Sequence, residues 1–229
     1  MRLISRYLQS INIPTDKAAD AENKFRVYRD FLIEQNKLFN LTAITDPQEI
    51  VTKHFIDSLA ALPYVNGKVA DIGTGAGFPG MVLAIVMQQN EFALIDSLNK
   101  RVNFLNELRD KLGLTNAHAI HSRAEDLPKT QTYDTIVSRA VSRLNTLCEY
   151  CLPFVKTGGT FISYKSDDCE EEINEAKTAI KILGGKIEDV KQVNVFGTDI
   201  VRKLVLIKKI KETPQKYPRS QNKPKKQPL

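Results

Sequence analysis

The sequence predicts one α/β domain: a seven-stranded, mostly parallel sheet with an antiparallel edge hairpin, preceded by a helical extension. Three observations support this fold class. From about residue 67, short apolar runs alternate with helical patterns, which is typical of buried parallel strands covered by helices on both faces. The last two strand-like runs are separated by a short turn, as in a hairpin. The chain has 229 residues, of which 42% are hydrophobic, enough for one such domain and an elaboration.

The N-terminal part, residues 1–62, is predicted to be a helical extension. Pro14–Asp16 marks the end of one helix and the start of the next, whose apolar residues recur near helical spacing. Those residues are Phe25, Tyr28, Phe31, Leu32 and Leu38. Asp46–Pro47 begins a further helix, in which Phe55 and Leu59 lie on one apolar face.

The central part, residues 63–208, is predicted to contain the sheet. Its parallel strands are expected at Lys68–Ile72, Phe92–Ile95, Ala117–Ile120, Thr135–Val137 and Gly159–Tyr164. The helices between them are expected at about 80–89, 99–112, 140–152 and 169–183. Lys186–Val195 and Ile200–Ile207 form the predicted edge hairpin around the turn Phe196–Asp199.

The basic residues are concentrated at the C-terminus. The last 22 residues hold eight Lys and Arg and one acid, whereas the whole chain has a formal net charge of +6. Such a Pro-rich, basic segment cannot bury enough apolar surface to fold by itself, so residues 209–229 are expected to be a disordered tail. Basic termini of this kind commonly contact nucleic acid, and a solvated tail that only aids solubility is the alternative.

Composition excludes several other classes of protein. No apolar run reaches the roughly 18 residues that span a bilayer, and the first residues lack the apolar stretch of a secretory signal. Three cysteines, Cys148, Cys151 and Cys169, are too few for a disulfide scaffold, which favours a reducing, cytoplasmic location. Cys148 and Cys151 lie within a predicted helix without a second cysteine pair, so packing is favoured over zinc binding.

The clearest functional signal is the glycine-rich loop Asp71–Gly80, which follows a strand and begins a helix. Its glycines let the backbone turn sharply and let a ligand lie against main-chain N–H groups, although a purely structural turn is the alternative for the loop alone. The next strand ends in Asp96, whose carboxylate can accept hydrogen bonds from both ribose hydroxyls of a nucleoside. The third strand ends in the polar turn Ser122–Asp126 at the same edge of the sheet. Together these strand ends predict a nucleoside site.

The nucleoside that fits best is S-adenosylmethionine (SAM). A nicotinamide dinucleotide places its pyrophosphate at the helix N-terminus, where the nearby Asp71 would repel it. The same carboxylate suits the cationic amino group or the sulfonium of SAM, and the edge hairpin fits a methyltransferase sheet better than a dehydrogenase sheet. A nicotinamide-dependent oxidoreductase and a non-enzymatic RNA-binding module are the two alternatives.

Motifs along almost the whole chain are similar to those of one family. They are Asn40–Thr42, Lys53–Leu59, the Asp71–Gly80 loop, Leu94–Arg101, Arg123–Asp126 and Ser138–Val141. In these segments the chain resembles the bacterial small-subunit (16S) rRNA guanine-N7 methyltransferases, the RsmG or GidB family. The resemblance implies a SAM-dependent, Rossmann-like fold and transfer of a methyl group from SAM to guanine N7. It also implies 16S rRNA, the small ribosomal subunit or its assembly intermediate as partner, with no membrane and no metal.

The resemblance implies roles for individual residues as well. The cofactor would be held by Gly73, Gly75, Phe78, Asp96, Ala124, Glu125 and Arg139. The candidate RNA-binding residues are Asn40, Lys53, His54, Arg101 and Lys165. Arg139 would lie beside the methionine carboxylate or the incoming RNA phosphate, with a surface salt bridge as the alternative. For His54 and Asp57, a local surface pair is the alternative to a role in shaping the RNA site.

Missing motifs restrict the chemistry. Enzymes that methylate exocyclic amines carry an Asn/Asp-Pro-Pro-aromatic turn after the fourth strand, where this sequence has Ser138–Val141. Methylation of carbon 5 in a pyrimidine needs a cysteine nucleophile at a comparable position, and no such motif is present. Guanine N7 has a free lone pair at neutral pH, so alignment of N7, methyl carbon and sulfur is the main requirement. No catalytic base is therefore predicted.

Overall fold

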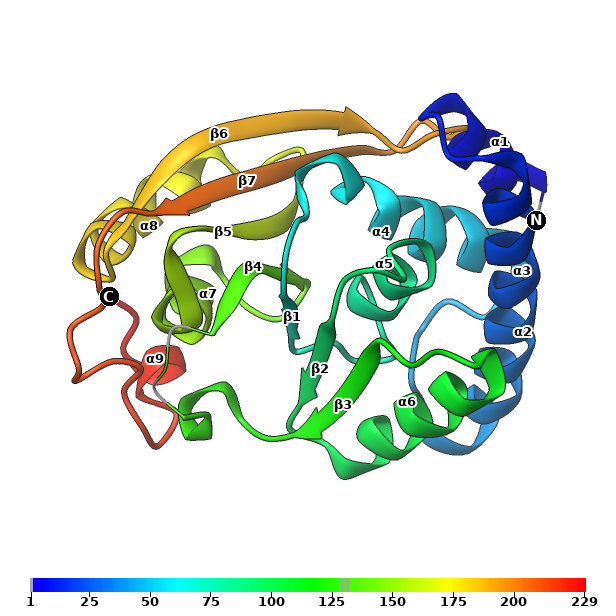
Figure 1. Cartoon of the computed structure of the whole chain (residues 1–229). Coiled ribbons are helices and arrows are strands. Elements are labelled where there is room, and N and C mark those ends of the chain that lie inside the picture. Colours follow the sequence, from blue (N-terminus) through cyan, green and yellow to red (C-terminus); the bar gives the residue numbers. More distant parts are fainter. Residues whose placement is uncertain (1, 129, 131) are drawn as a thin grey trace.

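In the computed structural model, seven strands form one sheet with helices on both faces (Figure 1). The structure describes residues 2–128, 130 and 132–229. The strands are β1 (Val69–Ile72), β2 (Phe92–Asp96), β3 (Ala117–His121), β4 (Tyr133–Arg139), β5 (Val155–Ser166), β6 (Gly185–Asn194) and β7 (Val201–Lys209). Their order is β3-β2-β1-β4-β5-β7-β6, and β7 is antiparallel to both of its neighbours. The other neighbouring strands are parallel, so the predicted fold class is confirmed.

The helical elements follow the predicted order. The N-terminal ones are α1 (Arg2–Ser10), α2 (Thr15–Phe39), α3 (Pro47–Glu49), the π-helical η1 (Ile50–Ile56), α4 (Asp57–Leu59) and η2 (Leu62–Tyr64). Those within and after the sheet are α5 (Gly80–Val86), α6 (Asn99–Leu112), η3 (Ala124–Asp126), α7 (Leu144–Cys151), η4 (Leu152–Phe154), α8 (Glu170–Ile182) and α9 (Lys223–Lys226). In the described part of the chain, no helix combines the length and the apolar character needed to cross a membrane.

The helix after β4 begins four residues later than expected. Residues 140–143 form a turn instead, in which Ala140 has a left-handed φ of 57°. The first helical amide, that of Leu144, donates to the Glu172 carboxylate on α8, which fixes the start of α7. This turn becomes important below, because it lies at the carboxyl end of a central strand.

Two hydrophobic layers cover the two faces of the sheet. Successive side chains of a strand point to opposite faces, so Val69 and Ala70 on β1 belong to different layers. The layer that contains Val69 includes residues of α2, η1, α5 and α6, whereas the layer that contains Ala70 includes residues of α7 and α8. Continuous apolar strands are buried on both faces for this reason.

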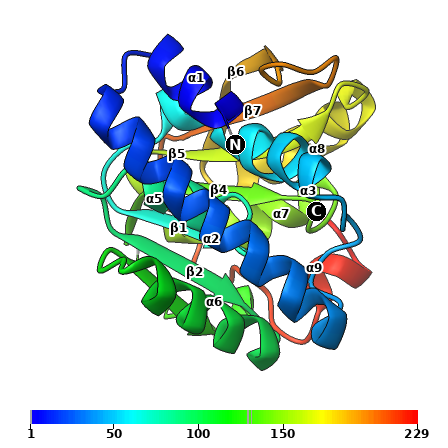
Figure 2. The ribbon, with the colours of Figure 1, turned by 90° about the vertical axis from the view of Figure 1, so that its right-hand side faces the viewer.

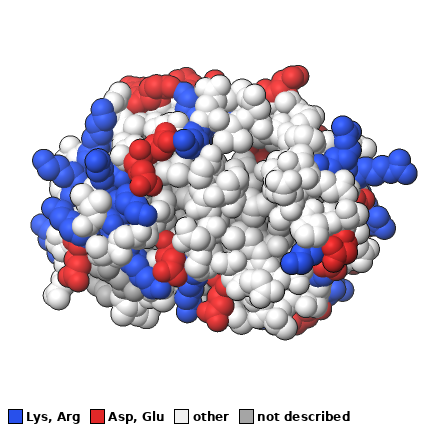
Figure 3. All heavy atoms as spheres, turned by 45° about the horizontal axis from the view of Figure 1, so that its top comes forward, with Lys and Arg blue, Asp and Glu red and all other residues white. Residues whose placement is uncertain are grey.

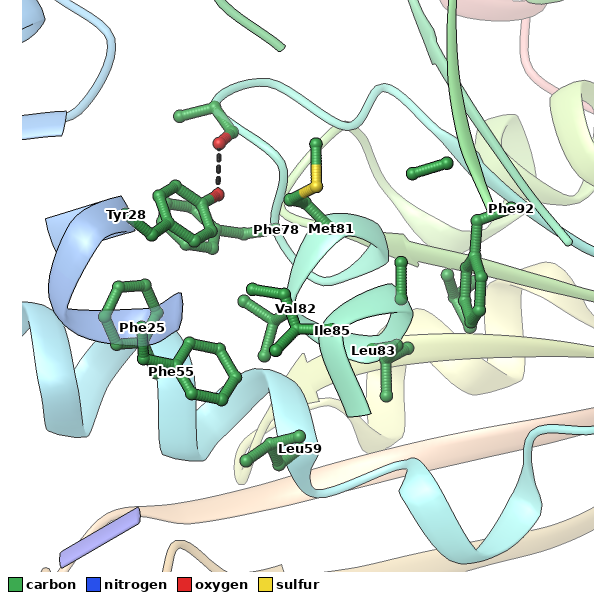
Figure 4. Packing of buried hydrophobic residues seen from close by; sticks show 14 of the residues in the cluster. Phe25, Tyr28, Phe55, Leu59, Phe78, Met81, Val82, Leu83, Ile85 and Phe92 are labelled. Carbon is green, nitrogen blue, oxygen red and sulfur yellow. Dashed lines mark hydrogen bonds between the residues drawn. The ribbon is translucent and has the colours of Figure 1, made fainter. Parts of the chain in front are cut away.

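The N-terminal extension packs onto the glycine-rich loop. Helix α2 lies against α5 and α6 (Figure 2). The Tyr28 ring stacks on Phe78 with centroids 5.5 Å apart, and Phe55 packs beside both rings (Figure 4). The Tyr28 hydroxyl donates a hydrogen bond to the carbonyl oxygen of Ala76 in the loop. The extension therefore fixes the shape of the loop from outside the sheet.

The C-terminal segment, defined here as residues 210–229, differs from the sequence-based expectation. Instead of a disordered tail, it folds back from β7 along α7 (Figure 1). Tyr217 is buried in the layer that contains Ala70, and the Arg219 guanidinium pairs with the buried Glu149 on α7. Composition bears on whether this segment folds alone, and it does not reveal that the domain supplies the surface on which it packs.

Candidate active site

A cleft of about 400 Å³ opens at the carboxyl ends of the parallel strands, the edge where open α/β sheets bind ligands. We call it the strand-end cleft. Its lining comes from the ends of β1, β2 and β4, from the turn after β3, and from α6, α7 and the C-terminal segment. The lining residues are Ile72, Gly73, Ile95, Asp96, Ser97, Arg101, Ser122, Arg123, Ala124, Glu125, Ala140, Val141, Ser142, Tyr150, Asn222 and Lys225.

Gly73 passes this cleft in a conformation that favours glycine. Its φ is 75°, and an added Cβ would lie 2.4 Å from Cγ2 of Val141. The neighbouring Gly75 has a φ of 62°, but an added Cβ would meet nothing within 4 Å. The first glycine is therefore required for space as well as for backbone conformation, and the second mainly for conformation.

Asp96 connects the glycine-rich loop to the next strand. Its Oδ2 accepts hydrogen bonds from the Gly75 amide at 2.9 Å and from Arg101 Nη1 at 3.3 Å. Its Oδ1 accepts from the Leu98 amide at 2.9 Å. Each carboxylate oxygen has two lone pairs, so Oδ1 can still accept one further donor. The carboxylate is thus fixed by the loop and can still bind a ligand hydroxyl.

Asp71 does not line the strand-end cleft. It is fully buried, and its Oδ2 accepts a hydrogen bond of 2.7 Å from the Gly80 amide at the start of α5. Burial raises the pKa of this carboxyl to about 7, and the Gly80 hydrogen bond and the Arg139 charge oppose that shift. The carboxyl therefore stabilises the glycine-rich loop and α5, and it does not reach the cleft where the sequence suggested that it would meet a cationic group.

A second, larger cleft of about 880 Å³ lies on the other side of the turn that follows β4. We call it the basic cleft, because five Lys and Arg line it beside two acids, Asp57 and Glu172. The basic residues are Lys53, Arg139, Arg143, Lys165 and Arg202. Ala140, Val141 and Ser142 line both clefts, so a single turn separates them.

A buried ion-pair network forms the floor of the basic cleft. The Asp57 carboxylate is fully buried and accepts from Arg139 Nη1 and from Arg202 Nε, each at 2.8 Å. Arg139 Nη1 also donates to the carbonyl oxygen of Lys53 at 3.2 Å. A buried carboxylate is costly without partners, and the two arginines supply them. The same contacts join β4, β7 and the π-helical segment.

His54 is held in one neutral tautomer within this network. Arg139 Nη2 lies 3.2 Å from His54 Nδ1, and a guanidinium can only donate, so Nδ1 is the acceptor and Nε2 carries the proton. Nε2 then donates to Thr42 Oγ1 at 2.7 Å. Burial and the adjacent Arg139 charge lower the pKa of His54 to about 3. With both nitrogens engaged, His54 positions its neighbours and is not a free base.

Lys165 fixes the shared turn from the side of the basic cleft. Its Nζ donates to the Ser142 carbonyl oxygen at 3.0 Å and to the Glu172 carboxylate at 2.6 Å. Glu172 in turn accepts from the Leu144 amide. The turn that separates the two clefts is therefore held by hydrogen bonds at its C-terminal end, where α7 begins.

The structure distributes the sequence-predicted residues over both clefts. The strand-end cleft is lined by four of the predicted cofactor-binding residues, Gly73, Asp96, Ala124 and Glu125. The basic cleft is lined by three of the predicted RNA-binding residues, Lys53, His54 and Lys165. Two residues lie in the cleft opposite to the one expected. Arg139, predicted to bind the cofactor, lines the basic cleft, and Arg101, predicted to bind RNA, lines the strand-end cleft beside Asp96. Gly75, Phe78 and Asn40 line neither cleft.

The three residues outside the clefts have structural roles. Gly75 donates its amide to Asp96, and Phe78 is stacked between Tyr28 and His54, 4.3 Å from the His54 ring centroid. Asn40 ends α2 with a left-handed φ of 49° and lines a separate hollow next to Thr42.

Sequence reasoning did not select several residues that the structure brings into the site. Asp57 was considered only together with His54, as a local surface pair or as part of the RNA site, and it was not among the candidate binding residues. Val141 ends the motif Ser138–Val141, but no role was expected for it. Arg202 and Tyr150 carry no signal in the sequence, because only the packing of β7 and α7 places them at the clefts. Cys148 and Cys151 are buried in the layer between α7 and the sheet, and no group of three metal-ligating side chains forms among the described residues.

Comparison with known proteins identifies the family of this chain. A family model described as rRNA small subunit methyltransferase G, GidB, matches residues 21–201. The chain is 47% identical over 218 residues to the ribosomal RNA small subunit methyltransferase G of Clostridium perfringens, which covers 92% of this chain and 91% of that protein. It is 45% identical to the protein of the same name from Lachnoclostridium phytofermentans, over 100% of this chain and 98% of that protein.

Solved structures share the fold at low sequence identity. A SAM-dependent methyltransferase from Aquifex aeolicus superposes with a TM-score of 0.54 at 21% identity, covering 71% of this chain and 93% of that one. M. jannaschii TYW2 in complex with AdoMet superposes with a TM-score of 0.53 at 17% identity, covering 63% of this chain and 70% of that one. Both similarities support the Rossmann-like methyltransferase sheet.

Proposed function

Because the chain belongs to the rRNA small subunit methyltransferase G family, we propose that it methylates N7 of a guanine in 16S rRNA. It is a SAM-dependent rRNA methyltransferase by family membership. The observation that carries the finer proposal is the pair of clefts that share the turn Ala140–Ser142. One cleft has the glycine loop and carboxylate of a nucleoside site, and the other has the positive charge that a polyanion requires.

The strand-end cleft fits SAM in size and in the donors and acceptors it offers. Its volume of about 400 Å³ is in the range of small-molecule sites. Asp96 would accept the ribose hydroxyls, the turn with Ala124 and Glu125 would meet the adenine, and the loop at Gly73 would pass the methionine end. When bound, SAM supplies a methyl group activated by its sulfonium.

The basic cleft is the proposed RNA site. Lys53, Arg143 and Lys165 surround it, and the ion-paired Arg139 and Arg202 form its floor. Cationic side chains position RNA through its phosphates without reading the sequence. Lys and Arg also gather at the end of the molecule where Figure 1 shows α8 and the C-terminal segment (Figure 3). This additional positive surface supports an RNA footprint wider than one nucleotide.

Transfer to N7 needs no proton movement. The N7 lone pair attacks the methyl carbon while the carbon–sulfur bond breaks and its electrons stay on sulfur, so the positive charge passes to the purine. Consistent with this, His54 is neutral with both nitrogens engaged. The protein then contributes alignment of the two reactants across the shared turn.

The decisive experiment supplies SAM with a labelled methyl group to rRNA from a strain that lacks this gene. Naked 16S rRNA, the 30S particle and an assembly intermediate are tested separately, and the modified nucleotide is mapped. We expect one guanine to carry the label at N7 in at least one of these substrates. Label on another base position, or none on any substrate, would contradict the proposal.

We also propose how the chain is divided and where it acts. Residues 63–208 would be the catalytic core, and residues 1–62 would form an extension that supports the loop and the RNA site. Action on ribosomal RNA favours a cytoplasmic location.

A further inference from the structure

The C-terminal segment forms one wall of the strand-end cleft. Asn222 and Lys225 line the cleft together with Glu125 and Tyr150. Asn222 has a left-handed φ of 59° and precedes α9, so the chain turns sharply at this point. The composition of this segment suggests an RNA-binding tail. Its residues nevertheless line the strand-end cleft and not the basic cleft that is proposed for RNA.

The segment is anchored where it leaves the sheet. Lys209, the last residue of β7, is 1% exposed, and its Nζ donates to the carbonyl oxygens of Leu152 at 2.7 Å and Leu183 at 3.0 Å. The Thr213 hydroxyl donates to the same Leu183 oxygen at 2.6 Å. A buried ammonium needs such acceptors, so these contacts fix the direction of the segment.

A second anchor lies directly behind the cleft. Arg219 donates to Glu149 from its amide at 2.7 Å, from Nε at 2.9 Å and from Nη2 at 2.6 Å. The Glu149 side chain is 1% exposed, and its charge-assisted pairing with Arg219 offsets the free-energy cost of burying the carboxylate. Glu149 precedes Tyr150 on α7, so the anchor positions the segment next to a residue that lines the cleft.

A third set of contacts holds α9 itself. Thr146 on α7 donates its hydroxyl proton to the Pro224 carbonyl oxygen at 3.2 Å, and Arg219 Nη2 donates to the Gln227 carbonyl oxygen at 2.8 Å. Pro224 is buried, and Leu229 packs against the hydrophobic layer that contains Ala70. Lys225 is therefore presented to the cleft by a fixed backbone.

We propose that the C-terminal segment is part of the cofactor site, with Asn222 and Lys225 contacting the nucleoside end of SAM. Glu125 and Tyr150 line the same cleft; Glu125 lies in the turn after β3, and Tyr150 lies on α7. Adenine offers ring nitrogens as hydrogen-bond acceptors, and an ammonium and an amide are donors that match them. Glu149 and Arg219 are positioning residues in this arrangement. The inference rests on the proposed function for the identity of the ligand.

The test compares two neighbouring lysines. Lys225→Ala and Lys226→Ala remove the same charge from the same short helix, but Lys226 does not line the strand-end cleft. Calorimetry with SAM and with S-adenosylhomocysteine should show affinity weakened by about three- to ten-fold for Lys225→Ala, the value of roughly one hydrogen bond. Lys226→Ala should bind within about two-fold of the wild type.

The outcomes separate this inference from the proposed function. If the wild-type protein does not bind SAM, the proposed function fails. If the wild type binds SAM and the two lysine variants match it, only the inference is wrong. A Lys225→Ala variant that loses RNA affinity but keeps SAM affinity would equally overturn the inference, because the segment would then serve the RNA.

A second variant tests the positioning residues. Glu149→Gln keeps the shape of the side chain but leaves Arg219 without its charged partner. We expect KM for SAM to rise about three- to ten-fold while kcat at saturating SAM stays within about two-fold, since the segment would be displaced and not the reacting atoms. An unchanged KM in a folded variant would contradict the positioning role.

Discussion

The two clefts share a turn, but they are built in different ways. The strand-end cleft takes most of its polar groups from consecutive strand ends, with Gly73, Asp96 and Glu125 following one another along the chain. The basic cleft is assembled from distant segments, since Lys53, Arg139 and Arg202 come from η1, β4 and β7. The difference shows how a common cofactor fold acquires its own substrate site. The strand ends supply the cofactor chemistry, and elements packed around them supply the acceptor site.

The two clefts also differ in the groups that surround their buried carboxylates. In the strand-end cleft, Asp96 is fixed by main-chain amides and one arginine, as suits a small ligand with hydroxyls. In the basic cleft, the buried Asp57 is surrounded by two arginines, and further basic residues remain at its rim. A variant that damages one cleft should therefore leave the function of the other measurable.

The largest effect is expected from Gly73→Val. The new side chain would need a left-handed φ and would collide with Val141 where the cofactor passes. SAM binding, measured by calorimetry, should be abolished, whereas RNA binding should remain. Thermal unfolding of Gly73→Ala and Gly75→Ala provides the control, because both carry backbone strain but only the first collides with Val141. Wild-type SAM affinity in Gly73→Val would remove the loop from the site.

The next largest effect is expected from Arg139→Lys. Lysine keeps the charge but cannot contact Asp57, His54 and the Lys53 carbonyl at once, as the guanidinium does. Loss of charge-assisted hydrogen bonds of about 1.5–3 kcal/mol corresponds to roughly ten- to hundred-fold in kcat/KM for RNA. SAM affinity should stay within about two-fold. If SAM affinity falls as much as RNA methylation, Arg139 belongs to the cofactor site after all.

A smaller effect is expected from Asp96→Asn. The amide keeps one acceptor oxygen but loses the charge that two backbone amides and a ribose hydroxyl would share. SAM should bind more weakly by about 1 kcal/mol, roughly five-fold, with RNA affinity unchanged. Calorimetry and filter binding measure the two affinities. A selective loss of RNA affinity would reverse the assignment of the two clefts.

For the wild-type protein the smallest effect concerns pH, and it involves the partly buried His54 in the basic cleft and the buried Asp71 that holds the glycine-rich loop. The pKa of His54 falls from 6.5 to about 3, so only the unfolded chain binds its proton between these values, and stability contributed by this residue rises with pH there. The pKa of Asp71 rises from 3.8 to about 7, so only the folded protein holds that proton, and its contribution falls as pH rises. Between about pH 4 and 6.5 the two slopes oppose each other.

Wild-type stability should therefore change little with pH in that range, as far as these two groups are concerned. In His54→Gln only the contribution of Asp71 remains of the two. The free energy of unfolding should therefore fall as pH rises, by up to about 1.4 kcal/mol per pH unit. Asp71→Asn should show the opposite slope. Urea unfolding at several pH values measures both, and a His54→Gln profile parallel to that of the wild type would refute the account.

Local sequence was sufficient for the strand-end residues of the strand-end cleft and for the order of the elements. Alternating strands and helices, the Asp71–Gly80 loop and Asp96 at the end of its strand are patterns whose parts are close together in the chain. The parallel sheet then brings successive strand ends to one edge without further information. Gly73 and Asp96 lie in the predicted cleft for that reason.

Tertiary structure decided what lies around this cleft. Arg139 lies in the basic cleft, directly before a turn that begins with the left-handed Ala140 and that no local pattern marks. Arg101 lies in the strand-end cleft, where it pairs with Asp96. Arg202 meets Asp57 across 145 positions of the chain. The C-terminal segment is ordered because Glu149 and the hydrophobic layer beside α7 receive it. Composition describes what a segment can do alone, whereas burial against the rest of the domain determines whether it folds.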